Sequence, residues 1–355
     1  MMKTPGRQAR ALPTPFQLLG WGMATIGLAC LGFVTWYWLS NASGQTPGDT
    51  HNYILAGLRL NAGHQLYEYG PGDPRSAWSA TYALFSPPLI GVLFRPIVLL
   101  PANGQYIWWL AMDVLELGAA VALVLRAPLA TGIALIPLSL CVGMAMQVGN
   151  VDCLVLPGLL LAWCWIVRGH DGRAALVIGL LASLKLTPVI FVWWLVVTGR
   201  RRAAGIAIAC GVALAVVAIV GSEPLIFPRF YEVAMTNLTA PPSDLGPPAL
   251  ARAAGLPNLF VSWLPRGILL AGALAMWASR RRPGLSWAIG AQLMWLGSPV
   301  IAIHTPALAL VAIAPLAWPM AASAGRRLRD FPRDAAREVA PNAGRTWPGI
   351  ATGLD

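Results

Sequence analysis

The sequence predicts an all-α protein that crosses a membrane many times. Of its 355 residues, 57% are hydrophobic and only 11% are charged, and the mean hydropathy is +0.63. A soluble domain carries roughly 25% charged residues, so this chain has little surface suited to water. Apolar runs of about 18 residues or more recur, which is the length needed to cross a hydrocarbon core roughly 30 Å thick. We expect a bundle of about ten or eleven transmembrane helices, some of them broken or re-entrant.

The apolar runs divide the chain into three parts. We expect a cytoplasmic N-terminus over 1–16, a membrane domain over 17–322, and a cytoplasmic, disordered tail over 323–355 that is rich in Arg, Pro and Gly. Two polar stretches, 41–83 and 222–262, are long enough to fold outside the membrane core. The runs expected to form membrane helices are 17–39, 84–100, 105–125, 127–147, 151–167, 174–198, 203–221, 263–279, 285–302 and 305–322.

The first run, Gln17–Leu39, follows basic residues, as the apolar part of a signal peptide does. It is longer than such a segment, and Asn41-Ala42-Ser43 is a weak cleavage site. We therefore expect a retained first span that leads into the polar stretch 41–83.

Arginine clusters between the apolar runs predict the orientation. The net charge of +11 is spread over short loops and does not form one soluble basic face, so nucleic acid is not an expected partner. Basic loops stay in the cytoplasm. We therefore expect Arg200–Arg202, Arg280–Arg282 and both termini on the inner side of a bacterial cytoplasmic membrane. The stretches 41–83 and 222–262 are then outside, and the turn Pro101–Gly104 is inside.

Two topologies remain open in the middle of the chain. In the first, 127–147 and 174–198 each form one full span. In the second, 127–147 is a re-entrant pair of half-helices and 174–198 breaks at Lys185-Leu186-Thr187-Pro188, because proline disrupts the helix before it. The charge bias favours the second, since it keeps Arg168 and Arg173 inside. It also brings four polar residues near the outer face: Gln147, Asn150, Asp152 and Lys185.

Three ionisable residues are candidates for chemistry on the outer side. Asp49 opens a stretch of interleaved apolar and polar residues that suggests a helix at the membrane interface. Two roles for Asp49 are equally open: a base that deprotonates a sugar hydroxyl, or a residue that caps the start of that helix. His304 is either a functional residue at membrane depth or a satisfied structural histidine. Lys185 either snorkels to the surface or meets an anion such as a lipid phosphate, whose developing charge it would stabilise.

Charged residues also occur inside the second and third apolar runs. A short turn makes these runs antiparallel neighbours, which places Arg95 and Asp113 at a similar depth. We expect an ion pair between them, with Glu116 close by.

The chain contains no Walker A, GxSxG or HExxH motif. Asp49 and His51 without a third ligand do not make a metal site, and we expect neither a metal nor another cofactor. The main alternative to an enzyme is a secondary transporter or a lipid or glycan flippase, which broken helices and a midplane lysine would suit.

Short motifs follow one another along the membrane region. They are Asp49-x3-Tyr53, Ala56-Gly57, Gly63-x-Gln65-Leu66-Tyr67, Ser86-Pro87-Pro88-Leu89, Pro96–Pro101, Gly149–Asp152, Leu184–Pro188, and Ser298-Pro299 ahead of His304. In their order and spacing they resemble glycosyltransferase family 87, a group with the GT-C fold that includes mycobacterial polyprenyl-phosphomannose-dependent mannosyltransferases. The resemblance runs from about residue 45 to residue 320.

The resemblance implies a GT-C-like bundle and an inverting transfer of mannose, or a similar hexose or pentose, from a polyprenyl-phosphate donor. The acceptor would be a lipid-linked or envelope glycan, reached among membrane lipids at the outer face. Asp49 matches the loop aspartate of the family, the general base, and His304 matches a histidine of the same cavity. The other residues expected to hold the donor phosphate or to line the cavity are Lys185, Arg59, Asn150, Asp152, Tyr53 and Tyr67.

The chain departs from the family pattern at two places. The family usually has Gly-Gln-x-Asn where this chain has Gly149-Asn150-Val151-Asp152, and it often has a Trp where this chain has Ala302. We expect these departures to concern the sugar and the acceptor.

Overall fold

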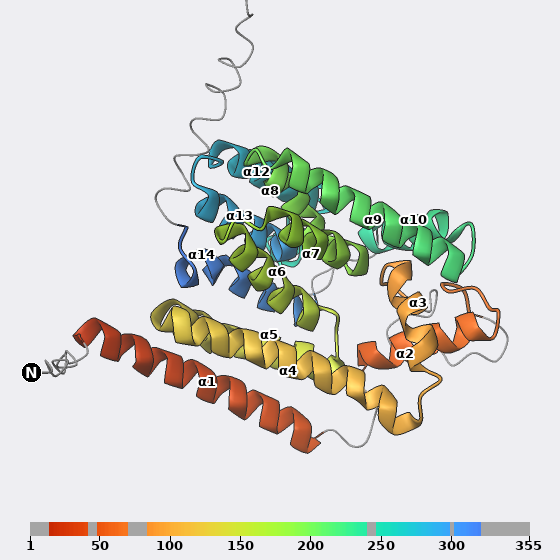
Figure 1. Cartoon of the computed structure of the whole chain (residues 1–355), viewed down its shortest axis with the longest axis horizontal. Helices are drawn as coiled ribbons and strands as arrows, with labels where there is room; N and C mark the ends of the chain where they lie inside the picture. Colours follow the sequence, from red (N-terminus) through yellow and green to blue (C-terminus); the bar gives the residue numbers. More distant parts are fainter. Residues whose placement is uncertain (1–13, 42–47, 70–83, 240–245, 299–301, 321–355) are drawn as a thin grey trace, which may run out of the picture. The chain divides into compact units, whose positions relative to one another are not determined.

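The computed structural model describes residues 14–41, 48–69, 84–239, 246–298 and 302–320. All regular structure in these ranges is helical (Figure 1), which confirms the predicted class. The helices are α1 (Pro15–Asn41), α2 (Gly48–Asn61), α3 (Pro88–Ile97), α4 (Ala102–Arg126), α5 (Pro128–Val148), α6 (Asp152–Val167), α7 (Asp171–Leu184), η1 (Thr187–Val189), α8 (Ile190–Val197), α9 (Arg201–Gly221), α10 (Ile226–Thr239), α11 (Pro247–Ala253), α12 (Asn258–Ala278), α13 (Pro283–Leu296), η2 (Thr305–Ile313) and α14 (Ala314–Ala317). The tail over 323–355 and most of the expected N-terminal segment lie outside the described residues.

Within these ranges, five helices are long and apolar enough to cross a membrane, namely α1, α4, α5, α9 and α12. Shorter apolar helices accompany them, including α6 and the η1–α8 and η2–α14 pairs. The chain is therefore a polytopic membrane protein, as the composition predicted.

Helices α1 and α5 lie side by side and run in the same direction. Gly20 of α1 faces Leu129, near the start of α5. Val34 of α1 faces Gly143, near the end of α5. A Cβ added at Gly132 would lie 2.4 Å from the backbone of α1, so glycine is what lets the two helices approach this closely. Such close packing is a main source of helix association in lipid, where apolar surface alone drives little.

Helix α4 runs antiparallel to α5. Near the start of α4, the indole N–H of Trp109 donates to the carbonyl of Met146, near the end of α5, with an N···O distance of 2.6 Å. The start of α4 therefore lies at the same end of the bundle as the ends of α5 and α1. The prediction that the turn Pro101–Gly104 lies on the opposite side from the polar stretch 41–83 is wrong.

The reason lies in α3, which folds back on α2 and does not cross. With ten residues it is roughly 15 Å long, about half the thickness of a hydrocarbon core. Gly57 of α2 packs directly on α3, where an added Cβ would lie 2.7 Å from the carbonyl of Phe94. The apolar run 84–100 thus packs one face of α3 against protein and is too short to be a membrane span.

Arg95 of α3 also lies elsewhere than predicted. Its guanidinium donates to the side chain of Asn61 and to the carbonyl of Gly221 at the end of α9, with N···O distances of 2.9 and 2.7 Å. The expected ion pair with Asp113 is therefore not formed. Arg95 instead joins α2, α3 and α9.

The middle of the chain combines the two predicted topologies. Helix α5 continues through Pro137, so the re-entrant interpretation of 127–147 is wrong. The run 174–198 does break, since α7 ends at Leu184 and the chain restarts at η1, as predicted. Two predictions were thus wrong: 84–100 does not cross the membrane as α3, and 127–147 does cross it as α5. Each error changes the number of crossings before α6 by one, in opposite directions, so the predicted side of the loop after α6 is unchanged. The loop between α6 and α7 falls at the arginine-rich end, where Arg200 pairs with Asp171 at 3.2 Å.

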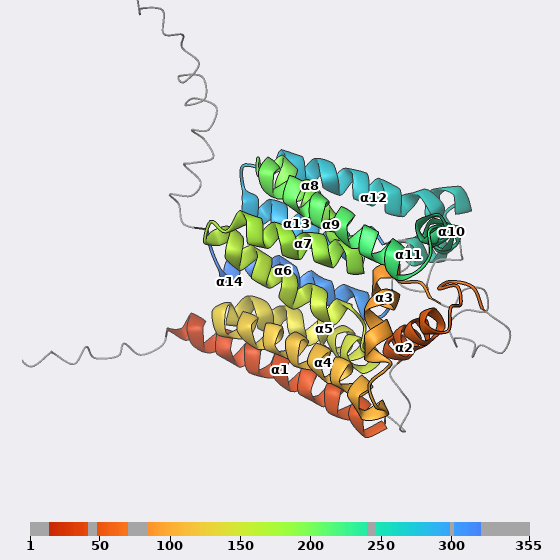
Figure 2. The same cartoon turned by 45° about the vertical axis from the view of Figure 1, so that its right-hand side comes forward.

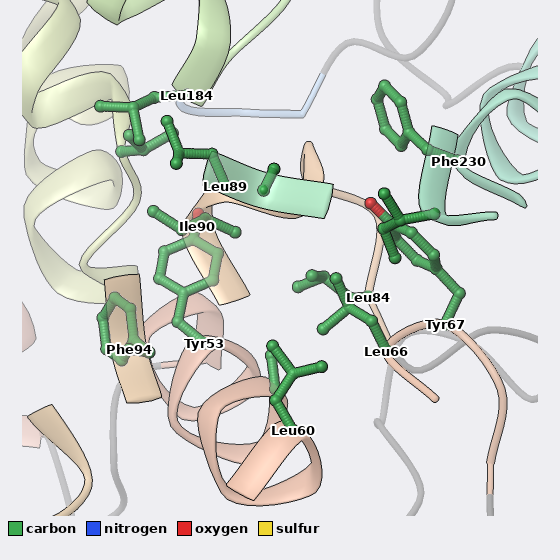
Figure 3. Close-up of a cluster of buried hydrophobic side chains, with 14 of the residues drawn as sticks. Tyr53, Leu60, Leu66, Tyr67, Leu84, Leu89, Ile90, Phe94, Leu184 and Phe230 are labelled. Atoms are coloured by element: carbon green, nitrogen blue, oxygen red, sulfur yellow. The ribbon is translucent and has the colours of Figure 1, made fainter. Parts of the chain in front are cut away.

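Beyond one end of the long helices, α2, α3 and α10 gather around a cluster of buried apolar side chains (Figures 2 and 3). The labelled members in Figure 3 are Tyr53, Leu60, Leu66, Tyr67, Leu84, Leu89, Ile90, Phe94, Leu184 and Phe230. Leu184, the last residue of α7, brings the α7 break into this cluster. The cluster thus anchors α2, α3 and α10 to the membrane bundle.

The contact at Gly132 gives a direct test of the α1–α5 packing. We expect Gly132→Leu to lower the thermal unfolding midpoint of the detergent-solubilised protein by several degrees, because overpacking costs about 1–3 kcal/mol. The matched control is Gly118→Leu on α4, where an added Cβ meets nothing within 4 Å. The midpoints are followed by tryptophan fluorescence, and equal values for the two variants would contradict the close contact between α1 and α5 at Gly132.

Candidate active site

Several polar residues meet where helices end at the α2 side of the bundle. Asp49 lies in the first turn of α2, and Asn150 and Asp152 lie where α5 gives way to α6. Lys185 follows the end of α7, and His304 precedes η2. Interrupted helices at membrane depth are tolerated where their polar groups find protein partners.

The turn between α5 and α6 holds α2 in place. Gly149 has a φ of +62°, which favours glycine, and a Cβ there would lie 2.0 Å from Oγ1 of Thr50. The Thr50 hydroxyl donates to the Gly149 carbonyl, with an O···O distance of 3.2 Å. Glycine therefore lets the first turn of α2 rest directly on this turn.

The side chain of Asn150 connects this turn to Asp49. Its Oδ1 accepts a hydrogen bond from the backbone N–H of Asp152 at 2.8 Å, which fixes the orientation of the amide. Its Nδ2 donates to Oδ2 of Asp49 at 2.6 Å. A donor held by a second bond orients the carboxylate that it contacts, so Asp49 is positioned by more than the start of its own helix.

Asp152 is a buried carboxylate between two basic side chains. It is only 1% exposed, and the ammonium of Lys185 contacts its Oδ1. The Nε2 of His304 lies 3.6 Å from its Oδ2. Lys185 therefore meets an anion that belongs to the protein itself, the Asp152 carboxylate, and its predicted contact with a lipid phosphate stays a prediction. The Lys185 side chain as a whole is still 21% exposed.

His304 is 12% exposed, so its protonation depends on its surroundings. Burial lowers the pKa of His304, the Asp152 carboxylate opposes this shift, and the Lys185 ammonium adds to it. This lowered pKa favours the neutral form of the imidazole. A neutral imidazole offers one N–H donor and one ring nitrogen that accepts.

The three remaining predicted residues lie in α2 and in the segment that follows it. Tyr53 is 2% exposed and packs on Phe94, and burial together with the nearby Asp49 carboxylate raises its pKa. The Tyr67 hydroxyl donates to the carbonyl of Ser86 at 3.0 Å. Arg59 is buried, and its Nε donates to the Gln65 carbonyl at 3.3 Å. Tyr67 and Arg59 thus brace the segment that follows α2, whereas Tyr53 lies next to Asp49.

Sequence reasoning missed two contributions to this region. Thr50 was not singled out, because its contact with Gly149 joins residues 99 positions apart and no local pattern signals it. Glu116 of α4 was expected near an ion pair, yet it is 1% exposed and its Oε2 has no hydrogen-bond partner. In the part of the chain that the structure describes, no group of three His, Cys, Asp or Glu side chains suits a metal ion.

Comparison with known proteins identifies the family. Residues 85–299, more than half of the chain, match glycosyltransferase family 87. The chain belongs to glycosyltransferase family 87. It is therefore a membrane glycosyltransferase, with a sugar donor and a glycan acceptor. The chain matches no curated protein and no solved structure.

The matched segment contains only some of the residues of the candidate site. It contains Asn150, Asp152 and Lys185, whereas Asp49 and His304 lie outside it. Both of these residues contact the matched segment: Asp49 accepts a hydrogen bond from Asn150, and His304 lies against Asp152. The geometry thus groups residues that the family match alone does not.

The pairing of Asp152 with Lys185 can be tested by a double-mutant cycle. Asp152→Asn should lower the free energy of unfolding by roughly 3 kcal/mol, because it leaves a largely buried ammonium without its counter-charge. Lys185→Met should act similarly, and the double variant should lose less than the sum of the two. The measurement is the unfolding midpoint of each purified variant.

The control is Asp171→Asn, which breaks the more exposed pair with Arg200 and should cost less than about 1 kcal/mol. Additive losses at positions 152 and 185 would show that the two side chains do not interact.

Proposed function

We propose that the protein transfers mannose, or a similar hexose or pentose, from a polyprenyl-phosphate donor to a lipid-linked or envelope glycan. The transfer takes place at the outer face of a bacterial cytoplasmic membrane, with inversion and with Asp49 as the general base. The observation that carries the proposal is the hydrogen bond from Asn150 to Asp49, which holds a carboxylate beside the Asp152–Lys185–His304 group.

Asp49 has the position that a general base needs. It is half-buried, and Asn150 holds one of its carboxylate oxygens. The second oxygen is the atom that takes the proton from the acceptor hydroxyl. The acceptor oxygen then forms a bond to the anomeric carbon, while the bond from that carbon to the phosphate oxygen breaks. Prenyl phosphate leaves with the electron pair, so one displacement completes the transfer.

Lys185 and His304 meet the charge that develops on the leaving group. The phosphate diester of the donor carries one negative charge, and the departing monoester carries up to two. The Lys185 ammonium, held in place by Asp152, stabilises this added charge, which is the kind of preorganised interaction that speeds such reactions. The neutral imidazole of His304 offers its N–H to the same phosphate without adding a full charge.

The arginine distribution supports an outward-facing site. Arg201 begins α9, whose last residue, Gly221, contacts Arg95 at the α2 side of the bundle. Arg282 precedes α13, whose end leads toward His304. The arginine clusters therefore lie at the end of the bundle away from the candidate site. Since basic loops stay in the cytoplasm, the site faces the exterior, and both termini are cytoplasmic.

The role of Asp49 is tested by Asp49→Asn in membranes supplied with labelled polyprenyl-phosphate hexoses and pentoses. We expect transfer to fall by about 10²- to 10⁴-fold, because the amide cannot accept the proton. The control is Glu68→Gln, which removes an exposed carboxylate from the segment after α2. Near-normal transfer by a folded Asp49→Asn variant would rule out this base. No transfer by the wild type from any donor would favour a transporter, to be examined by flux in liposomes.

The single displacement also predicts the stereochemistry. The product linkage should have the anomeric configuration opposite to that of the donor, because no covalent glycosyl-enzyme forms. Nuclear magnetic resonance of the isolated product gives the configuration directly. A product with the donor's configuration would require two displacements and would contradict the assigned role of Asp49.

A further inference from the structure

A groove opens between the first turns of α1 and α5, at the end of the bundle away from the candidate active site. It has a volume of about 330 Å³ and is lined by Phe16, Gln17, Gly20 and Trp21 of α1 and by residues 127–130 at the start of α5. Ligand sites in proteins typically have volumes of roughly 300–1,000 Å³. No step of the proposed reaction uses this groove.

The groove exists because the backbones of α1 and α5 move apart toward the starts of the two helices. A Cβ added at Gly132 would lie 2.4 Å from the backbone of Met23 in α1. One turn closer to the helix starts, a Cβ added at Gly20 would lie 3.4 Å from the backbone of Leu129, which is an ordinary contact distance. Since Gly20 has no side chain, the widening space between the helices is not filled from α1.

One side chain that lines the groove offers hydrogen-bond donors. The Oε1 atom of Gln17 accepts a hydrogen bond from the backbone N–H of Thr14 at 2.8 Å, and the Thr14 hydroxyl oxygen accepts one from the backbone N–H of Gln17 at 3.3 Å. This reciprocal pair is a capping box, and it fixes the start of α1. Because the amide oxygen is engaged, the amide nitrogen of Gln17 is the part that can donate to a ligand.

A positive charge lies next to the groove. Arg126 is the last residue of α4, directly before the groove residue Ala127, and its side chain is exposed. Among the described residues, no carboxylate forms an ion pair with Arg126. The turn that carries Arg126 lies at the membrane surface, whereas the groove continues from this turn along roughly two turns of α1, about 10 Å, toward the membrane core.

A ligand that fits this arrangement has a hydrocarbon chain joined to an anionic group at the surface. In the sequence, three further basic residues precede α1, namely Lys3, Arg7 and Arg10. Basic residues close to the end of a membrane helix attract anionic lipids, and basic pockets between membrane helices bind their head groups. The charge of this end therefore favours an anionic membrane lipid over a neutral one.

We propose that the groove binds an anionic diacyl phospholipid, with one acyl chain between α1 and α5 and the phosphate beside Arg126 and Gln17. This site goes beyond the proposed function. Only its assignment to the inner leaflet rests on the orientation given there. A guanidinium and an amide N–H both donate to phosphate oxygens, and the bond from the guanidinium is charge-assisted. A zwitterionic lipid offers the same phosphate but adds a cation, which Arg126 repels.

The bound lipid stabilises the attachment of α1 to the turn between α4 and α5. Its acyl chain fills the space that the diverging helices leave, and its phosphate joins α1 to the end of α4 through Gln17 and Arg126. A ligand that binds the folded protein alone shifts the folding equilibrium toward the folded state by mass action. The anionic lipid should therefore raise the unfolding midpoint of the detergent-solubilised protein.

The first experiment measures lipid binding to the detergent-solubilised full chain by native mass spectrometry. Phosphatidylglycerol and phosphatidylcholine with the same acyl chains are titrated separately. We expect the first phosphatidylglycerol to bind more tightly, and Arg126→Gln to weaken its binding about fivefold without changing that of phosphatidylcholine. The matched control is Arg173→Gln, which removes an exposed arginine at the start of α7, at the same end of the bundle. It should leave both affinities unchanged.

A second variant tests the groove itself. Ala130→Phe places a large side chain in the groove and should abolish binding of the first phosphatidylglycerol. The matched control is Ala29→Phe, because Ala29 is exposed on α1 but does not line the groove. This control should bind the lipid as the wild type does.

A third measurement uses the wild type alone, so it does not depend on the folding of a variant. Phosphatidylglycerol with a photoreactive diazirine in one acyl chain is crosslinked to the protein, and adducts are located by mass spectrometry. We expect adducts within 16–21 and 127–130 that unlabelled phosphatidylglycerol suppresses and phosphatidylcholine does not.

Several outcomes would overturn the proposal. Equal affinities of the wild type for the two lipids would show ordinary contact with membrane lipid. Equal losses in Arg126→Gln and Arg173→Gln would show a general effect of charge at this end. Adducts confined to other helices would place the lipid elsewhere, and dimers without bound lipid would assign the groove to a second copy of the chain. None of these measurements requires sugar transfer, so failure of the proposed function leaves them unaffected.

Discussion

The contact between Asp152 and Lys185 is the interaction on which the candidate site depends. A carboxylate exposed by 1% is costly unless it is paired, and an ammonium at membrane depth is costly for the same reason. Together they allow two interrupted helices, at the α5–α6 turn and at the end of α7, to meet without an unpaired charge. His304 adds a third interruption on the far side of the same carboxylate. Polar contacts thereby hold three helix interruptions together at one place.

Most of the architecture could be predicted from local pattern, because membrane helices follow from hydropathy and length. The break at Lys185-Leu186-Thr187-Pro188 could be predicted because proline acts on the residues directly before it. The run 84–100 could not be assigned, since an apolar helix looks the same whether it faces lipid or protein. Whether this run faces lipid or protein is decided by the contact of Gly57 with Phe94, which joins two separate helices.

In the candidate site, too, the residues could be predicted from the sequence but their contacts could not. Asn150, Asp152, Lys185 and His304 stand out in the sequence because polar residues are rare in and between the apolar runs, whereas Asp49 stands out by its place just beyond the first run and by its motif. The contacts between these residues cannot be seen in the sequence, because the hydrogen bond from Asn150 to Asp49, for example, joins residues 101 positions apart. It requires a left-handed turn at Gly149 and the absence of a side chain there. The departure from the family's Gly-Gln-x-Asn pattern also gains a physical meaning, since the residue in the last position, Asp152, supplies the counter-charge for Lys185.

The order of these residues along the chain has a consequence for biosynthesis. Asp152 leaves the ribosome before Lys185, and His304 comes last, close to the end of the described residues. At a synthesis rate of about 5–20 residues per second, Asp152 waits a few seconds for Lys185 and several more for His304. During that interval the Asp152 carboxylate has no counter-charge from Lys185. The candidate site is assembled only after the α7 break and then His304 have been made.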